Sequence, residues 1–188
     1  HAEVPVINAL SDAEHPCQAL ADLLTIREHK KKIAGIRIAF IGDGNNVATS
    51  LALSSTLLGA HFSIASPHDY ALPAELAEKT MEYAKISGCR FTHSDSPQKA
   101  IEDSDVVYTD VWTSMGQESE QAKRIEAFKT YRVTHELLGL ARKDAIFMHD
   151  MPAHRGEEVD ADVIDGEQSV VFDQAENRLH AQRALLSL

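Results

Sequence analysis

Three stretches of the chain combine acids, amides and glycines in the way that ligand-binding loops do. The central one is Asp110 to Gly116, which follows the β-branched and aromatic run Val106 to Thr109. An acid at the end of a buried strand, followed by a loop that contains a glycine, is where α/β sheets place ligand chemistry. Asp110 could hold an amine there, and Ser114 to Gly116 could form a closing flap with Gly116 as its hinge. A simpler interpretation is that Asp110 only caps the element that follows.

Two further stretches have the same character. Gly42 to Asn46 follows the apolar run Ile36 to Ile41, and His149 to Gly156 follows another short apolar run. Asn45 and Asn46 stand at the start of a predicted helix, where side-chain amides and the helix N-terminus both suit a carboxylate. The simpler alternative is that one of these asparagines only caps the helix.

The segments that join these stretches alternate between strand-like and helix-like patterns. Short β-branched and apolar runs predict strands over residues 36–41, 61–65, 90–92, 106–109 and 145–148. Longer segments predict helices over residues 15–32, 47–58, 73–87, 96–104, 118–130, 134–140 and 174–188, and 163–164 and 170–172 remain as short apolar pieces. The alternation predicts an α/β fold, a doubly wound parallel sheet with helices on both faces. Because parallel strands bring their carboxyl ends to one edge, the three loops are expected to meet.

The turn Gly42-x-Gly44 also fits the start of a dinucleotide-binding fingerprint. However, Val47 stands at the third glycine position, and the second strand ends in Ser66-Pro67 rather than in an acid that could bind a ribose. The sequence therefore disfavours a nucleotide and favours a carboxylate or an amino-acid backbone at this turn.

Composition narrows the class of protein. The chain has 188 residues, 44% hydrophobic and 25% charged, which suits one domain with a substantial core. A formal net charge of -11 disfavours a nucleic acid partner. No apolar run approaches membrane-spanning length, and Cys17 and Cys89 make no disulfide framework, so we expect a cytoplasmic protein that does not bind a membrane.

Five segments, in order along the chain, resemble motifs of the ornithine carbamoyltransferases, in the aspartate/ornithine carbamoyltransferase family. They span nearly the whole chain, and their joint occurrence is far more specific than any one of them. The segments are His15-Pro16-Cys17-Gln18 with Leu20-Ala21-Asp22-Leu23, Gly42-Asp43-Gly44-Asn45-Asn46, Asp110-x-Trp112-x-Ser114-Met115-Gly116-Gln117, His149-x-x-Pro152, and Ala175-Glu176-Asn177-Arg178.

The resemblance implies transfer of the carbamoyl group of carbamoyl phosphate to the δ-amine of L-ornithine, which gives L-citrulline and phosphate. His15, Gln18 and Arg178 would bind carbamoyl phosphate, although taken singly they could be helix caps or a surface cation. An amine attacks a polarised carbonyl in this reaction, so catalysis would depend on orientation and on stabilising the oxyanion. The resemblance implies no metal and no organic cofactor.

The ornithine side of the implied site uses the loops at the strand ends. Asn46 would bind the carboxylate of L-ornithine, and Asp110 would bind its amine. Ser114 and Met115 would contact the substrate backbone as their loop closes. Further substrate contacts, by position in the motifs, would come from Asn45, His149, Met151 and Pro152. The family also implies a cis peptide bond between Met151 and Pro152, which an X-Pro sequence permits.

Asp150 departs from the family, which has a cysteine beside the reacting amine. With Asp110 it would place two carboxylates around one ammonium, which strengthens binding but raises the pKa of the amine, and a protonated amine is no nucleophile. Alternatively, repulsion raises the pKa of one carboxyl and makes it a candidate base. We assign catalytic roles to Asp110, Asp150 and Arg178, and expect Asp150 to slow ornithine turnover or to select another amine. Asp150, Asp110, His149 and His154 could also be a metal cluster, but their spacing matches no strong signature, and we expect no metal.

The resemblance also implies a second domain. The Ser-x-Arg-Thr-Arg motif, with which the family binds phosphate, does not occur in these 188 residues. We therefore expect residues 1–188 to be the ornithine-binding domain, with 1–32 and 174–188 as a linking segment and interdomain helices. The N-terminal carbamoyl-phosphate domain would be absent, which would leave the chain inactive alone, and the full-length enzyme would be a homotrimer. The alternatives are a carbamoyltransferase for a related amine and a non-catalytic amino-acid-binding module.

Overall fold

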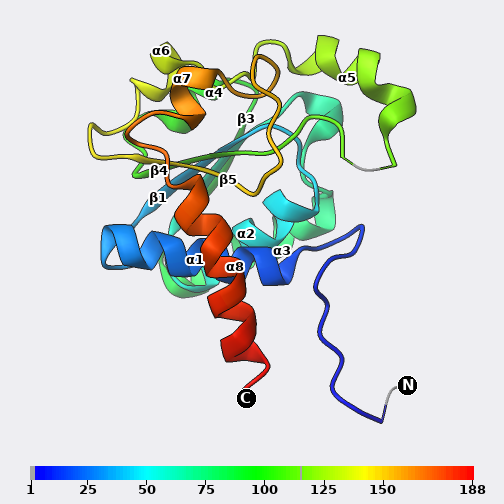
Figure 1. The fold of residues 1–188 in the computed structure, drawn as a ribbon, viewed down its shortest axis with the longest axis vertical. Helices are drawn as coiled ribbons and strands as arrows, with labels where there is room; N and C mark the ends of the chain where they lie inside the picture. Colours follow the sequence, from blue (N-terminus) through cyan, green and yellow to red (C-terminus); the bar gives the residue numbers. More distant parts are fainter. Residues whose placement is uncertain (1–2, 115) are drawn as a thin grey trace.

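A computed structural model describes residues 3–114 and 116–188, and its centre is one parallel sheet (Figure 1). The strands lie in the order β3-β2-β1-β4-β5. Ile41 at the end of β1 is in register with Ala65 of β2 and Thr109 of β4, so these carboxyl ends are level. The strands are β1 (Arg37–Ile41), β2 (His61–Ala65), β3 (Phe91–Ser94), β4 (Val106–Thr109) and β5 (Ile146–His149). The predicted parallel α/β sheet is confirmed.

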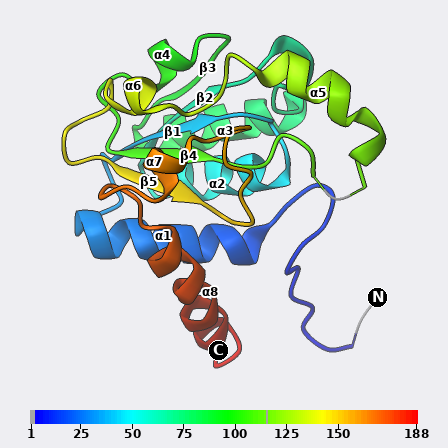
Figure 2. The ribbon, with the colours of Figure 1, turned by 45° about the horizontal axis from the view of Figure 1, so that its top comes forward.

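Helices cover both faces of the sheet (Figures 1 and 2). One face carries α1 (Pro16–Lys30), α2 (Asn46–Leu57), α3 (Ala74–Ser87) and α8 (Val171–Leu185). The other carries α4 (Pro97–Ile101), α5 (Gln121–Phe128), α6 (His135–Leu138) and α7 (Ala161–Ile164). Two short 3-10 helices, η1 (His68–Tyr70) and η2 (Glu118–Glu120), lie in the connections.

The alternation of side chains along each strand explains this double cover. On β1, Ile38 and Phe40 belong to the apolar core under α1 and α2, while Ala39 and Ile41 belong to the core on the opposite face. All four side chains are buried, as expected for a strand in the middle of a covered parallel sheet.

Four helices differ clearly in length from the sequence prediction, and one of them is α4, which ends at Ile101 instead of residue 104. The helix predicted over 118–130 is the 3-10 turn η2 followed by α5, and the one predicted over 134–140 is only α6. The last helix begins at Val171 instead of residue 174. Val170 and Val171 are buried in the two cores, so the apolar piece predicted at 170–172 packs onto the sheet as the start of α8.

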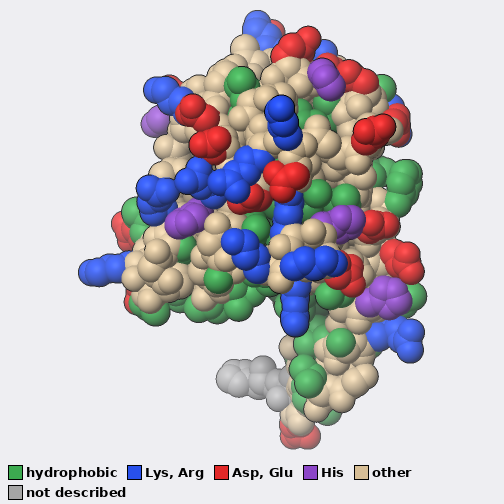
Figure 3. All heavy atoms as spheres, turned by 90° about the vertical axis from the view of Figure 1, so that its left-hand side faces the viewer, with side chains coloured by type: hydrophobic (Ala, Val, Ile, Leu, Met, Phe, Trp, Pro, Cys, Tyr) green, Lys and Arg blue, Asp and Glu red, His purple; other side chains and the backbone are tan. Residues whose placement is uncertain are grey.

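The last turns of α8 project from the body of the molecule (Figures 1 and 2). Figure 3 shows apolar side chains on this projecting part, and Leu179 and Leu186 on α8 and after it are 59% and 75% exposed. The assignment of 174–188 to an interdomain helix stays a prediction. None of the helices in the described residues is both long and apolar enough to span a bilayer.

Candidate active site

The strand order places the switch point of the sheet between the loops that follow β1 and β4, and we call this region the crevice. These strands are neighbours in the sheet, but the chain leaves β1 towards α2 on one face and leaves β4 towards α5 on the other. In open α/β sheets, ligands bind where neighbouring loops diverge in this way. The Gly42–Asn46 and Asp110–Gly116 stretches therefore lie at the position that the fold favours for a ligand.

Asn45 and Asp110 join the two sides of this crevice. Asn45 Nδ2 donates to Asp110 Oδ2 at 2.7 Å, and Asp110 Oδ1 accepts from the Val111 N–H at 2.6 Å. Asn45 Oδ1 also accepts from the Val47 and Ala48 N–H groups, so this residue is the helix cap that the sequence left open. The expectation that these loops meet is confirmed.

Asn46 and Ser114 each form a hydrogen bond with another residue of the chain. Asn46 Nδ2 donates to the Ser11 carbonyl at 2.8 Å, on the segment that precedes α1. The Ser114 N–H donates to Gln117 Oε1 at 3.2 Å. Met115, the other predicted flap residue, lies outside the described residues. Gly116 has φ +88°, a left-handed conformation in which glycine is the favoured residue.

Asp150 follows β5 and faces Asp110 from the neighbouring strand. Its side chain is 11% exposed, and its Oδ1 atom has no hydrogen-bond partner among the described residues. Burial raises the pKa of Asp150 well above its usual value, and the charge and hydrogen bonding of Asp110 and the charge of Asp22 raise it further. This direction agrees with the alternative in which burial and repulsion raise the pKa of one carboxyl of the pair, here Asp150.

His149 holds the turn behind Asp150. The Met151 N–H donates to His149 Nδ1 at 2.9 Å, so Nε2 carries the ring proton and faces Glu158 Oε1 at 3.3 Å. Glu158 is fully buried, and it also accepts from the His154 N–H at 2.5 Å. The Met151–Pro152 peptide bond is cis, as the resemblance implied.

Gln18 and Arg178 meet on the α1 side of the crevice. Arg178 Nη1 donates to Gln18 Oε1, and Gln18 Nε2 donates to Asp22 Oδ1 at 2.8 Å. Asp22 also accepts from Gln174 at 2.7 Å and from the Tyr108 hydroxyl at 3.2 Å. Burial raises the pKa of Asp22 to about 7 against the effect of these three donors. Asp22 thus fixes the amide of Gln18 with its oxygen towards Arg178.

His15 is the N-cap residue of the same helix, but its side chain makes no capping hydrogen bond. Its N–H donates to Ser50 Oγ at 2.8 Å, and its Nδ1 lies 2.9 Å from the Ala9 carbonyl. Burial and the charge of Arg178 lower the pKa of His15, against the effects of Ala9 and Asp110. His15 is therefore a neutral imidazole at pH 7, influenced by both sides of the crevice.

A second buried acid, Asp43, is paired with a cation. Arg124 of α5 donates to Asp43 Oδ2 at 2.7 Å and to the Trp112 carbonyl at 2.9 Å, and its guanidinium lies 4.8 Å from the Tyr70 ring centroid. We call this group the Asp43–Arg124 clamp. It connects the turn after β1 to the loop after β4.

The turn at Gly44 explains why the dinucleotide fingerprint is only partial. A Cβ atom at Gly44 would lie 2.3 Å from the Leu72 nitrogen and 2.5 Å from the Ala71 carbonyl carbon. The Gly44 N–H also donates to the Tyr70 carbonyl at 2.8 Å. The chain's own segment after β2 thus packs directly against the glycine that such a fingerprint reserves for a pyrophosphate.

The structure divides the predicted metal cluster in two. Asp110, His149 and Asp150 each offer a ligand atom within 4.8 Å of one another, whereas His154 groups with Glu157 and Glu158. Hydrogen bonds within the chain engage both ring nitrogens of His149, and we keep the expectation that no metal belongs here.

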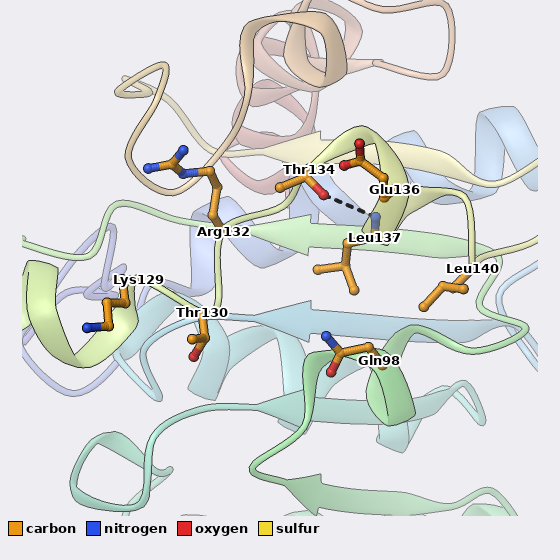
Figure 4. Close-up of a pocket in the computed structure, with 8 residues that line it drawn as sticks. All are labelled: Gln98, Lys129, Thr130, Arg132, Thr134, Glu136, Leu137 and Leu140. Atoms are coloured by element: carbon orange, nitrogen blue, oxygen red, sulfur yellow. Dashed lines mark hydrogen bonds between the residues drawn. The ribbon is translucent and has the colours of Figure 1, made fainter.

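A separate cavity lies away from this crevice. It has a volume of about 510 Å³ and opens between α4 and α6 (Figure 4). Its lining residues are Gln98, Lys129, Thr130, Arg132, Thr134, Glu136, Leu137 and Leu140. Lys129 is paired with Glu126, and Arg132 donates to the Glu157 carbonyl, so the chain already binds both cations. We assign no ligand to this cavity.

Sequence reasoning missed four polar residues of the crevice: Asp22, Tyr108, Gln174 and Glu158. Asp22 had a signal, because it follows Gln18 by four residues and therefore lies on the same face of α1. Gln174 had none, because its contact to Asp22 spans 152 residues and depends on how α8 packs on α1.

Comparison with known families matches almost the whole chain. The model for the aspartate/ornithine carbamoyltransferase Asp/Orn binding domain matches residues 34–188. The model for the carbamoyl-P binding domain of the same proteins matches residues 1–28.

Individual relatives agree with this result. The chain is 54% identical over 187 residues to an ornithine carbamoyltransferase of Acidothermus cellulolyticus, and 54% identical over 185 residues to one of Bacillus subtilis. The match covers all of this chain but only 60% of the Acidothermus protein. This chain therefore spans about three fifths of the length of its curated relatives. The ornithine carbamoyltransferase structure from Pyrococcus furiosus has a TM-score of 0.96 and 52% identity, with coverage of 100% of this chain and 60% of that one.

Proposed function

Because the chain belongs to the aspartate/ornithine carbamoyltransferase family, we propose that it forms the ornithine-binding part of an ornithine carbamoyltransferase. The proposed reaction transfers the carbamoyl group of carbamoyl phosphate to the δ-amine of L-ornithine and needs no metal or organic cofactor. The proposed partners are these two substrates and a carbamoyl-phosphate domain. We place the complete enzyme, as a homotrimer, in the cytoplasm and in arginine biosynthesis.

One observation carries the proposal: the crevice contains a buried carboxyl pair to which the described part of the chain supplies no lysine or arginine. Asp110 is 6% exposed, Asp150 is nearly as buried, and no Lys or Arg among the described residues forms an ion pair with either. Buried charges are normally paired, because desolvation otherwise costs several kcal/mol. An ammonium group of a substrate is the cation that this pair is suited to accept.

The amino-acid end of L-ornithine fits the polar groups beside the pair. We propose that Asn46 binds the substrate carboxylate at the start of α2, where the helix dipole also favours an anion. Its amide now donates to the Ser11 carbonyl, a contact that the ligand would replace. Asn45 orients Asp110, and Ser114 and Met115 cover the substrate backbone.

Carbamoyl phosphate would bind on the α1 side of the same crevice. Arg178 would donate to its oxygens and stabilise the oxyanion, since a guanidinium presents several donors in a fixed plane. Gln18, oriented by Asp22, offers an acceptor for the carbamoyl amide. A neutral His15 could donate or accept a hydrogen bond without adding charge.

Asp150 is the feature that favours a second candidate function. A carboxyl pair that binds an ammonium strongly also keeps the amine protonated. The crevice would then suit a carbamoyltransferase for a related amine, or a non-catalytic amino-acid-binding module. His149, Met151 and Pro152 would hold Asp150 in place in each case.

The test separates binding from turnover. A chimera would join the first two fifths of the Bacillus subtilis relative, which this chain does not match, to the 188-residue chain. We expect the chain alone to bind L-ornithine in calorimetry without forming citrulline, and the chimera to form citrulline. Asp110→Asn in the chimera should lower kcat/KM for ornithine about a hundredfold, because a charged hydrogen bond is lost in a buried site.

Each other outcome points elsewhere. Citrulline formation by the chain alone would contradict the two-part arrangement. A chimera that binds ornithine without turnover would support the binding module, and turnover of another diamine at a higher kcat/KM would support the related amine.

A further inference from the structure

The Asp110–Asp150 pair differs from two other buried acids, Asp22 and Asp43, in what it lacks. Asp22 accepts three hydrogen bonds, and Asp43 has Arg124. Asp150 Oδ1 is buried and has no hydrogen-bond partner in the part of the chain that the structure describes, and it lies 3.6 Å from His149 Nδ1. An unsatisfied buried oxygen of this kind costs about 1–3 kcal/mol, which a ligand donor would recover.

The groups that face Asp150 come from three parts of the fold. Asp110 and Tyr108 approach it from β4, Asp22 from α1 and His149 from β5 itself. Arg178 of α8 acts on Asp22 and on His15. Apart from that guanidinium, the described groups around Asp150 are acids, a tyrosine and a histidine, so the charges of Asp110 and Asp22 add to burial in raising the pKa of Asp150.

We infer that Asp150 determines which amines the crevice accepts, by exchanging its proton for the ammonium group of the substrate. The inference rests on the proposed function, because it concerns the same amine site. When an ammonium enters between the two carboxyls, its charge favours ionisation of both, and the Asp150 O–H bond breaks with release of the proton to solvent. A neutral amine analogue has no charge with which to drive this exchange.

The exchange also prepares the chemical step. The ionised Asp150 carboxylate can take back one proton from the ammonium N–H, which leaves the lone pair that attacks the carbamoyl carbon. The new C–N bond forms as the C–O bond to phosphate breaks, and the second amine proton leaves with phosphate. Over the whole turnover one proton appears in solution, the one that Asp150 released on binding.

The Met151 backbone allows this change without a new unpaired group. The Met151 N–H now donates to His149 Nδ1. When Asp150 ionises, its carboxylate becomes a second acceptor on the residue that precedes Met151. Asp110 already accepts a hydrogen bond of this kind from the N–H of the next residue, Val111.

Calorimetry of the 188-residue chain tests the inference directly. L-ornithine is titrated at pH 7 in buffers of low and high ionisation enthalpy, so that the difference in heat counts released protons. A second titration uses the aminooxy analogue, in which oxygen replaces the δ-methylene and the terminal amine is neutral at pH 7. We expect up to about one proton released per ornithine, none per analogue, and ornithine binding that tightens as pH rises towards and through 7.

Two variants locate the effect. Asp150→Asn should release no proton, and its preference for ornithine over the analogue should fall about tenfold, since one of two carboxylates is gone. Asp103→Asn is the matched control, because Asp103 precedes β4 at the opposite end and its side chain is 71% exposed. It should behave as the parent does.

The outcomes separate the two proposals. Equal proton release by the parent and Asp150→Asn, or none by the parent, would overturn the exchange. If the chimera formed citrulline but ornithine binding released no proton, only the exchange would be overturned. If ornithine binding released the proton but the chimera were inactive, only the transferase proposal would be overturned. Absence of binding for both amines would contradict both proposals.

Discussion

Two buried acids, Asp43 and Asp150, stand at the same edge of the sheet but in opposite electrostatic surroundings. Asp43 follows β1 and is 2.7 Å from Arg124, a guanidinium whose side chain is 6% exposed. Asp150 follows β5 and faces a second carboxyl, with one oxygen unpaired. Burial raises the pKa of both, yet only Asp43 has a cation to oppose that effect.

The difference separates a structural acid from a ligand-binding one. Within the clamp, the chain supplies every charge that burial requires, so the clamp can hold two loops together without a ligand. Around Asp150 no Lys or Arg of residues 3–114 and 116–188 forms an ion pair, so a cationic ligand could supply the missing charge. A buried carboxyl at a strand end therefore indicates a ligand only when its cation is missing.

Breaking the clamp should have the largest effect on stability. Arg124→Leu removes the cation and leaves Asp43 buried without a partner, while the Trp112 carbonyl loses its donor. We expect the free energy of unfolding, measured by urea denaturation, to fall by about 3–5 kcal/mol.

A matched control for this change is Arg155→Leu. Arg155 makes two hydrogen bonds to Asp165, at 2.9 and 2.7 Å, but both side chains are about half exposed. Loss of that pair should cost less than about 1 kcal/mol. If the two variants were destabilised equally, burial would not be what gives the clamp its strength.

The opposite change, neutralising Asp150, should stabilise the chain. In the folded chain the pKa of Asp150 lies well above the unfolded value of 3.8, so the folded chain binds more protons between those two pH values. The parent therefore loses stability as pH rises through that window, by at most about 1.4 kcal/mol per pH unit. Asp150→Asn avoids this loss and can still donate to Asp110, so it should be more stable than the parent at pH 7, by about 1 kcal/mol or more.

Denaturation at several pH values checks the sign as well as the size. The advantage of Asp150→Asn should vanish near pH 4 and grow towards neutral pH. An advantage that is the same at every pH would mean that Asp150 ionises as an ordinary surface carboxyl does.

How far the sequence could predict this arrangement depends on the kind of contact. Asn45 and Asp110 had to approach each other once parallel strands were predicted, because both residues follow strands that share one edge. Which asparagine faces Asp110 was not predictable, since it depends on the backbone angles of Asn45 at the start of α2.

Two other contacts depend on packing between distant segments. Arg124 lies in a segment with the pattern of an exposed charged helix, yet it packs onto Tyr70 and is buried. Asp22 and Gln174 meet because α1 and α8 cross, and no local pattern in either helix signals the partner. Motifs and topology therefore predict the edge of the sheet, whereas the charge balance of each acid needs the folded structure.

The smallest effect should come from the other acid beside Arg124. Glu120 Oε2 lies 3.5 Å from Arg124 Nε, but the Glu120 side chain is 55% exposed, so water screens the pair. Glu120 also raises the pKa of Asp43 by repulsion, and its removal relieves that cost. Because these effects oppose each other, Glu120→Gln should lower the free energy of unfolding by no more than about 0.5 kcal/mol, and by less at 1 M salt. Glu120 and Asp43 share one guanidinium, so a loss above about 1 kcal/mol would show that solvent exposure does not determine the strength of each pair. The contrast between paired and unpaired acids would then need another physical cause.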